Sequence, residues 1–107
     1  MQADFVAKLD LLREACGFPL IVSSGYRSPA YNAKVSSTGR AGPHTTGRAV
    51  DLKVKGLQAW QVIYHAQRLG FTGIGVKQHG GHGTRFIHLD DLPRTKSRPR
   101  PWIWSYA

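Results

Sequence analysis

The stretch Gly42-Pro-His-Thr-Thr-Gly-Arg-Ala-Val-Asp51 places a histidine and an aspartate on a segment that runs from loop into strand. A second stretch, Phe86-Ile-His-Leu-Asp90, carries the same two residue types. Imidazole nitrogens and carboxylate oxygens are the usual ligands of a catalytic Zn²⁺, which takes three protein groups and keeps a fourth position for water. His44, Asp51 and His88 can supply such a set. The residues alone leave a second interpretation open, in which these are polar turns whose histidines face solvent.

The segment around His44 predicts a loop that turns into a strand, and Gly47 permits the tight turn. Residues 49–54, Ala-Val-Asp-Leu-Lys-Val, alternate in polarity and predict a central strand that carries one buried carboxylate, Asp51. Residues 35–43 are rich in Ser, Thr and Gly without periodicity, which predicts a loop ahead of the strand.

Two longer helices are predicted from apolar periodicity. Apolar residues recur on one face of residues 3–16, and a wider apolar arc on residues 56–70 predicts burial against a sheet, with Leu57, Trp60 and Tyr64 packed in the core. The remaining predicted elements are a buried strand at 19–23, a short helix at 29–34 capped by Ser28, and a hairpin of strands 71–77 and 85–90 joined by a turn at 78–83.

The order of these elements lacks regular alternation of helix and strand, so the predicted fold class is α+β, with a small antiparallel sheet flanked by helices. The chain has 107 residues, and we expect residues 1–107 to form a single domain. The basic, proline-containing segment 92–107 ends in Trp102-Ile-Trp104. Large aromatic side chains favour burial, so we expect this segment to pack back on the core with both tryptophans buried.

Composition narrows the classes of protein. No apolar run reaches the roughly 20 residues that span a bilayer, the N-terminus lacks the features of a secretory signal, and the single Cys16 excludes an intrachain disulfide. Fifteen Lys and Arg against six Asp and Glu give a formal net charge of +9. Such a charge favours polyanionic partners, either nucleic acid or an anionic cell wall, and does not by itself choose between them.

Three motifs together resemble the M15 zinc peptidases. They are Ser24-Gly-Tyr-Arg-Ser-Pro29, His44-Thr-Thr-Gly-Arg-Ala-Val-Asp51 and His88-Leu-Asp90. That family includes D-alanyl-D-alanine carboxypeptidases, dipeptidases and phage endolysins that cut peptidoglycan peptides, and it shares its fold with the hedgehog signalling domain. The resemblance runs from about residue 20 to 90. The basic, tryptophan-containing tail is similar to that of small phage and prophage members.

The resemblance implies that His44, Asp51 and His88 bind Zn²⁺, since they match the family's three ligands one for one. It also implies that Arg27, in the first motif, contacts the substrate or the transition state. A planar guanidinium suits this role because it can hold a carboxylate through two parallel hydrogen bonds. Gly42 departs from the family pattern, which usually has a serine two residues before the first zinc histidine. This departure affects substrate positioning more than metal binding.

The family's general base has no counterpart at its usual position. M15 peptidases usually carry Asp or Glu three residues before the last zinc histidine, whereas this chain has Arg85 there. His82 is the first candidate, because hedgehog-type relatives carry a glutamate there and an imidazole with a pKa of about 6.5 can accept a proton at neutral pH. Asp90 is the second candidate, either as the base or as a group that orients a zinc-bound imidazole. The alternative interpretation makes His79 and His82 polar turn residues.

Three functions are compatible with these features. The first is a Zn²⁺-dependent peptidase of peptidoglycan stem peptides, either a D-Ala carboxypeptidase or a cell-wall endopeptidase of phage or prophage origin. The second is a catalytically weak or inactive zinc domain that binds cell-wall peptide as a virion component. The third, a nucleic-acid binder, is disfavoured because basic and aromatic residues interleave only in the tail. We expect a monomer, made in the cytoplasm, that acts at the bacterial cell wall or within a virion.

Overall fold

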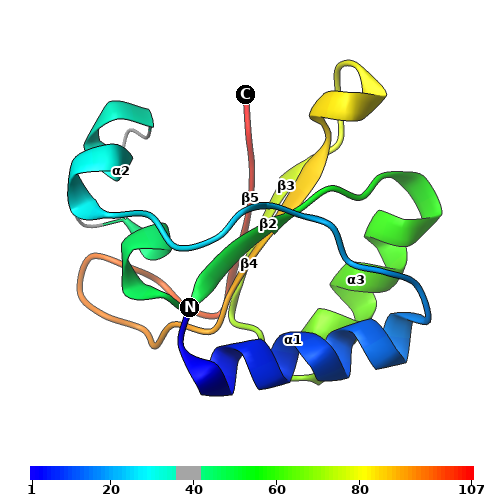
Figure 1. Cartoon of the computed structure of the whole chain (residues 1–107), viewed down its shortest axis with the longest axis horizontal. Helices are drawn as coiled ribbons and strands as arrows, with labels where there is room; N and C mark the ends of the chain where they lie inside the picture. The colour runs from blue at the N-terminus through cyan, green and yellow to red at the C-terminus, as the bar shows by residue number, and fades with distance from the viewer. Residues whose placement is uncertain (36–41) are drawn as a thin grey trace.

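The protein is described by a computed structural model that covers residues 1–35 and 42–107, so most of the loop predicted at 35–43 lies outside the described residues. The helices and strands, in chain order, are α1 Ala3–Cys16, β1 Val22–Ser24, α2 Pro29–Val35, η1 Pro43–Thr46, β2 Ala49–Leu52, α3 Gly56–Arg68, β3 Gly73–Lys77, η2 His82–Thr84, β4 Phe86–Asp90 and β5 Trp102–Ser105 (Figure 1). The elements η1 and η2 are short 3-10 helices. This arrangement confirms the predicted α+β class.

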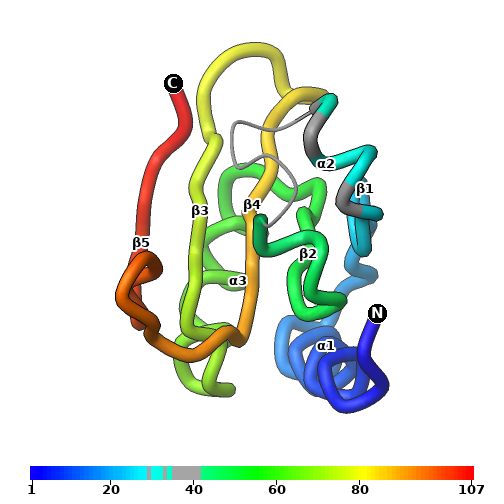
Figure 2. Tube along the Cα trace, turned by 90° about the vertical axis from the view of Figure 1, so that its left-hand side faces the viewer, coloured from blue at the N-terminus to red at the C-terminus, as the bar shows by residue number. Residues whose placement is uncertain are grey.

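The strands form one sheet in the order β1-β2-β4-β3-β5, and Figure 2 shows them side by side in that order. The predicted hairpin of β3 and β4 is antiparallel, and β2 pairs antiparallel with both β1 and β4. The sheet is nevertheless mixed, because β5 pairs with β3 in the parallel direction. The predicted small antiparallel sheet thus has one parallel pair at its edge, where the chain crosses over before β5.

The two faces of the sheet have different chemistry. On β4, Ile87 and Leu89 are buried in the hydrophobic core, which also contains Phe5, Leu9 and Leu12 of α1 and Ala59, Val62 and Ala66 of α3. Successive side chains of a strand point to opposite faces, so His88 and Asp90 belong to the other face. Helices α1 and α3 thus cover the apolar face and leave the polar one to the functional residues.

Two expectations about burial are wrong. Ile21 and Val22, predicted in a buried strand, are 61% and 45% exposed, because β1 is an edge strand with β2 as its single neighbour. The second stripe of α3 is also exposed: Leu57, Trp60 and Tyr64 have exposed fractions of 71%, 74% and 57%. A helix that packs flat on a sheet buries one stripe of its surface. In α3 the buried stripe is the one that contains Ala59, and the stripe beside it stays exposed.

The C-terminal segment returns to the sheet as β5, but its tryptophans are less buried than predicted. Trp102 is 54% exposed, and Trp104 is half-buried. As the last strand of the sheet, β5 has no neighbour on its outer side among the described residues. The tryptophans therefore cover the polar face of the sheet instead of entering the core.

Local signals in the sequence set several element ends. Ser28 Oγ accepts a hydrogen bond from the backbone N–H of Tyr31 at 3.2 Å, which confirms the predicted cap of α2. Gly47 has a φ of 75° and ends η1, which confirms the predicted tight turn before β2. None of the helices in the described part of the chain has the length and apolar character needed to cross a membrane.

Candidate metal centre

Three buried side chains meet on the face of the sheet that α1 and α3 leave open. Asp51 on β2 lies directly opposite His88 on β4 in the antiparallel register, and η1 brings His44 beside them. The exposed fractions of His44, Asp51 and His88 are 6%, 8% and 2%. One potential ligand atom from each side chain lies within 4.8 Å of the others. The structure therefore brings together the three residues predicted as metal ligands.

The position of His44 depends on the short helix that carries it. Pro43 begins η1, and the hydroxyl of Thr45 donates to the carbonyl of Gly42 at 2.7 Å. The backbone N–H of Arg27 donates to the carbonyl of His44 at 2.8 Å, which ties η1 to the segment after β1. These contacts hold His44 beside β2 although it is not part of the sheet.

Each histidine of this set has its second ring nitrogen held by an acceptor. His44 Nδ1 lies 2.8 Å from the carbonyl oxygen of Gly25, and His88 Nε2 lies 2.8 Å from Asp90 Oδ2. A carbonyl and an ionised carboxylate only accept hydrogen bonds, so these nitrogens carry the ring hydrogens of the neutral imidazoles. His44 Nε2 and His88 Nδ1 then present lone pairs at 3.2 and 3.1 Å from Asp51 Oδ1. Three acceptors converge, and a shared cation or added protons must hold them together.

This donor set fits Zn²⁺. Zinc bonds of about 2.0–2.1 Å in a tetrahedral arrangement put neighbouring ligand atoms about 3.3 Å apart. The 3.2 and 3.1 Å separations from Asp51 Oδ1 are close to that value. Zinc-bound imidazoles generally donate their other N–H to a carbonyl or carboxylate, and both histidines have such a partner. His44 Nε2, Asp51 and His88 Nδ1 therefore form a donor set that could hold Zn²⁺.

Burial and pairing act in opposite directions on the ionisable groups. Burial raises the pKa of Asp51, but the facing ring nitrogens of His44 and His88 outweigh it and lower that pKa to about 2. Burial lowers the pKa of His88, but hydrogen bonds to Asp51 and Asp90 raise it above its ordinary value. The two carboxylates thus favour a cation at His88, either a proton on the ring or a metal at the shared point.

Arg27, predicted to contact substrate, lies at the edge of this centre. Its Nη2 is 3.7 Å from Asp51 Oδ2, and its side chain is 17% exposed. Its Nε donates to Ser24 Oγ at 3.1 Å, and its Nη1 donates to Asn32 Oδ1 at 3.3 Å. These contacts fix a positive charge beside the carboxylate ligand and leave it partly open to solvent.

Asp90 lies behind His88, on the side of the ring away from Asp51. Its carboxylate accepts hydrogen bonds from Arg100 Nε at 2.9 Å, from Arg100 Nη2 at 2.8 Å and from the backbone N–H of Leu92 at 3.3 Å. Burial raises the pKa of Asp90, but His88 and Arg100 together lower it to about 2. Of the two predicted roles, this arrangement fits the group that orients His88 and does not fit the base, because donors already engage both oxygens.

His82, the first candidate for the base, lies on the loop between β3 and β4. Its Nδ1 is 3.0 Å from Nζ of Lys55, the residue before α3, and it lines a cavity together with Gln58 of α3. Arg85, at the family's usual carboxylate position, donates Nε and Nη2 to the carbonyl of Gly80 at 3.1 and 3.0 Å. Neither His82 nor Arg85 contacts a predicted metal ligand within the described part of the chain.

Three residues near the C-terminus surround the centre and were not predicted as site residues. The Trp104 ring centroid is 5.1 Å from that of His88, and the Arg100 guanidinium is 5.1 Å from the Trp104 ring. Tyr106 follows on the same face, with its ring centroid 6.4 Å from that of Trp104. The spacing of Trp102, Trp104 and Tyr106 by two residues was the available sequence signal, because it places aromatics on one strand face.

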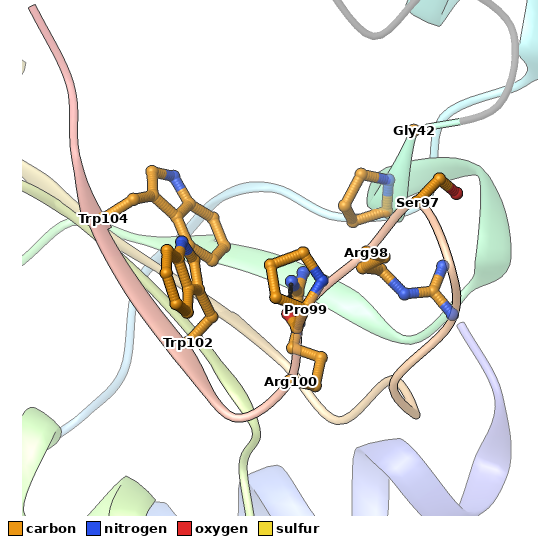
Figure 3. A pocket seen from close by; sticks show the side chains of 8 residues that line it. Gly42, Ser97, Arg98, Pro99, Arg100, Trp102 and Trp104 are labelled. Atoms are coloured by element: carbon orange, nitrogen blue, oxygen red, sulfur yellow. Dashed lines mark hydrogen bonds between the residues drawn. The ribbon is translucent and has the colours of Figure 1, made fainter.

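A cavity of about 340 Å³ adjoins the centre on this side (Figure 3). One part of its lining is Gly42 and Pro43, directly before His44, and the other comes from the segment 97–104, including both tryptophans. Figure 3 shows Trp102 and Trp104 projecting from β5 to the same side. An aromatic and cationic wall therefore borders the predicted metal ligands.

Comparison with protein families agrees with this geometry. A family model described as Peptidase M15 matches residues 2–90, and the chain therefore belongs to this family of peptidases. The matched range contains Arg27 and the three predicted ligands and ends before β5. Comparisons with curated proteins and with solved structures found no match.

Proposed function

We propose that this protein is a Zn²⁺-dependent peptidase that acts on peptidoglycan peptides. The observation that carries the proposal is the convergence of His44 Nε2, Asp51 Oδ1 and His88 Nδ1 in a chain of the Peptidase M15 family. When bound, Zn²⁺ supplies activation of water and polarisation of the scissile carbonyl. The proposed phage or prophage origin rests on the resemblance of the tail.

The chain's own residues would prepare the site and recognise the substrate. Gly25 and Asp90 hold His44 and His88 in the tautomers that direct lone pairs toward the metal position. Arg27 offers a charge within 3.7 Å of Asp51, where it can bind a terminal carboxylate of the peptide or the oxyanion that develops during hydrolysis.

No carboxylate of the chain is placed to take a proton in this reaction. All six acidic residues lie in the described part of the chain. Three are on α1, at positions 4, 10 and 14, and α1 packs on the apolar face of the sheet. Asp51 is a ligand, Asp90 pairs with Arg100, and Asp91 pairs with Lys8. His82 stays the predicted base, and this role requires the loop that carries it to move.

The proposal is tested with defined stem peptides that end in D-Ala-D-Ala and with cross-linked dimers. Zinc-loaded protein should release products that are absent after chelation and return when Zn²⁺ is added back. His88→Ala should give no turnover. Mass spectrometry separates the two activities, because a carboxypeptidase releases one D-Ala and an endopeptidase converts dimers into monomers.

A second candidate is a zinc domain that binds wall peptide without hydrolysing it. The observation in its favour is Arg85 at the position of the family's usual acid, together with the placement of His82 beside Lys55. Zinc-loaded protein that binds peptidoglycan in a sedimentation assay but turns over neither peptide would establish this function and refute the peptidase.

A further inference from the structure

The end of β5 holds Tyr106 firmly against the polar face of the sheet. Its backbone N–H donates to the carbonyl of Val76 at 3.1 Å, and its carbonyl oxygen lies 3.2 Å from His79 Nε2. Its ring centroid is 5.0 Å from that of Phe86, on the strand that carries His88. The backbone of Tyr106 is therefore held by β3, and its half-buried ring packs against Phe86 of β4.

Gly75 brings this part of the chain close to the metal ligands. In the sheet register, Asp51 lies opposite His88, His88 opposite Gly75, and Gly75 opposite Trp104. A Cβ on Gly75 would lie 2.7 Å from Trp104 atoms and 2.8 Å from Tyr106 Cε2. The missing side chain thus lets both aromatic rings lie over β3, where the Trp104 ring packs next to His88.

The Tyr106 hydroxyl is a potential hydrogen-bond donor on this face. A phenol O–H can donate one hydrogen bond, and the ring of Trp104, whose indole N–H can only donate, has its centroid 6.4 Å from that of Tyr106. No hydrogen bond found among the described residues uses that O–H as the donor. Burial raises the pKa of Tyr106 above its ordinary value of 10, and the charges of Asp51 and Arg27 also act on the phenol. The phenol therefore keeps its proton at neutral pH and lies close to the centre.

We propose that Tyr106 is a catalytic residue whose O–H donates a hydrogen bond to the substrate oxyanion, on the opposite side of the metal ligands from Arg27. Arg27 follows β1 at one edge of the sheet and Tyr106 follows β5 at the other, with β2, β4 and β3 between them. A donor aimed at developing negative charge stabilises the transition state more than the bound substrate. This inference rests on the proposed function.

The test compares Tyr106→Phe with wild type using two ligands of the zinc-loaded protein. One is a phosphinate peptide, whose tetrahedral anionic group resembles the transition state, and the other is the corresponding amide peptide. Tyr106→Phe should weaken phosphinate binding about 10-fold or more and change amide binding less than about 2-fold. Where turnover is measured, kcat should fall about 10²-fold with KM nearly unchanged. Zinc content and melting temperature should stay as in wild type, since the ring is kept.

Tyr64→Phe is the matched control, because Tyr64 is an exposed tyrosine on α3. It should leave both affinities and turnover unchanged. Equal phosphinate affinity in wild type and Tyr106→Phe would overturn the inference and leave the peptidase assignment intact. Wild type that binds phosphinate, loses that binding in Tyr106→Phe and shows no turnover would support the donor role and refute the proposed activity. A zinc-loaded wild type without phosphinate affinity would overturn both.

Discussion

A single hydrogen bond from each histidine would prepare the predicted centre for a metal. The carbonyl of Gly25 and the carboxylate of Asp90 take the ring N–H groups of His44 and His88, and the remaining lone pairs face Asp51. A free imidazole exchanges between two tautomers, and a ring that is already fixed loses less freedom when it binds Zn²⁺. At the residue scale, the groups around the ligands therefore matter almost as much as the ligands.

Asp90→Asn tests this dependence. The amide keeps the shape of the carboxylate but removes the charge that holds His88 and pairs with Arg100. We expect zinc affinity to fall about 10- to 100-fold, the usual effect of losing such a partner. Competition with a chelator of known affinity measures the change. Because Asp10 is exposed on α1, Asp10→Asn serves as the control. An unchanged zinc affinity in Asp90→Asn would show that the Asp90 contact does not organise the site.

At the scale of elements, β5 completes the site without adding much to the core. It supplies Trp104 and Tyr106 to the polar face, and the segment before it supplies Arg100 to Asp90. The family match ends at residue 90, before this strand begins. The wall that β5 forms beside the predicted ligands therefore lies outside the matched range.

The two tryptophans of β5 should differ in their contribution to stability. Trp104 packs on His88 and Arg100, so Trp104→Ala should lower the free energy of unfolding by about 2 kcal/mol, less than for a fully buried aromatic. Trp102 is 54% exposed, and Trp102→Ala should cost less than about 1 kcal/mol. Denaturant unfolding monitored by far-UV circular dichroism measures both values. Equal losses would contradict the placement of the two rings.

An ion-pair network joins α1 to the sheet. Arg48 donates to Asp4 Oδ1 and Oδ2 at 2.9 and 2.7 Å and to Asp91 Oδ1 at 2.9 Å. Because Lys8 of α1 also donates to Asp91, the helix is held by two cations and two carboxylates next to β2 and β4. This network is on the helix-covered side of the strand that carries Asp51, so it positions α1 and takes no part in the centre.

The Asp4 pair predicts a specific pH dependence of stability. Hydrogen bonds from Arg48 lower the pKa of Asp4 below 3.8 in the folded protein. A carboxylate of this kind stabilises the fold above its unfolded pKa and loses that contribution as the pH falls through its folded pKa. Wild type should therefore melt above Asp4→Asn at neutral pH, and the two melting temperatures should converge below a pH of about 3.8. A difference that persists unchanged at low pH would contradict this.

At the scale of the whole molecule, the two faces of the sheet have different roles. One face packs on α1 and α3 through apolar side chains, and the other carries His44, Asp51, His88 and Asp90. The formal net charge of the chain is +9, and some of its basic side chains form intramolecular ion pairs, since Arg48 and Arg100 pair with carboxylates. The remaining surface charge still suits a polyanionic wall, which stays a prediction.

Zinc should stabilise the whole fold, because its ligands come from η1, β2 and β4. Purified protein should contain about one zinc per chain. At free Zn²⁺ about 1,000-fold above its dissociation constant, the fold should gain about 4 kcal/mol, seen as a rise in melting temperature that a chelator reverses. His44→Ala should abolish this rise, and His65→Ala on α3 should keep it. Full zinc content in His44→Ala would refute the assigned ligand set.

Much of this protein follows from local sequence. The periodicity of residues 3–16, the Ser28 cap and the Gly47 turn each depend on interactions within a few residues, and the structure has them where the sequence predicted them. The metal-ligand set of His44, Asp51 and His88 was predicted in another way, from the resemblance of three motifs to the M15 peptidases, because His88 lies 37 residues from Asp51. Helix periodicity, caps and turns can be predicted from a sequence because the interacting residues are neighbours along the chain.

Tertiary structure decided what depends on distant partners. The apolar stripe of Trp60 on α3 is as regular as the buried one, and only the packing of the helix on the sheet shows which stripe is covered. The sequence left Asp90 open as a base or as a partner of His88, and only the folded chain shows that Arg100 and His88 both pair with its carboxylate. Tyr106 became a candidate because Gly75 lies between its strand and β4. Burial, pairing and pKa are set by segments that meet only in the folded chain, so the sequence alone could not assign these roles.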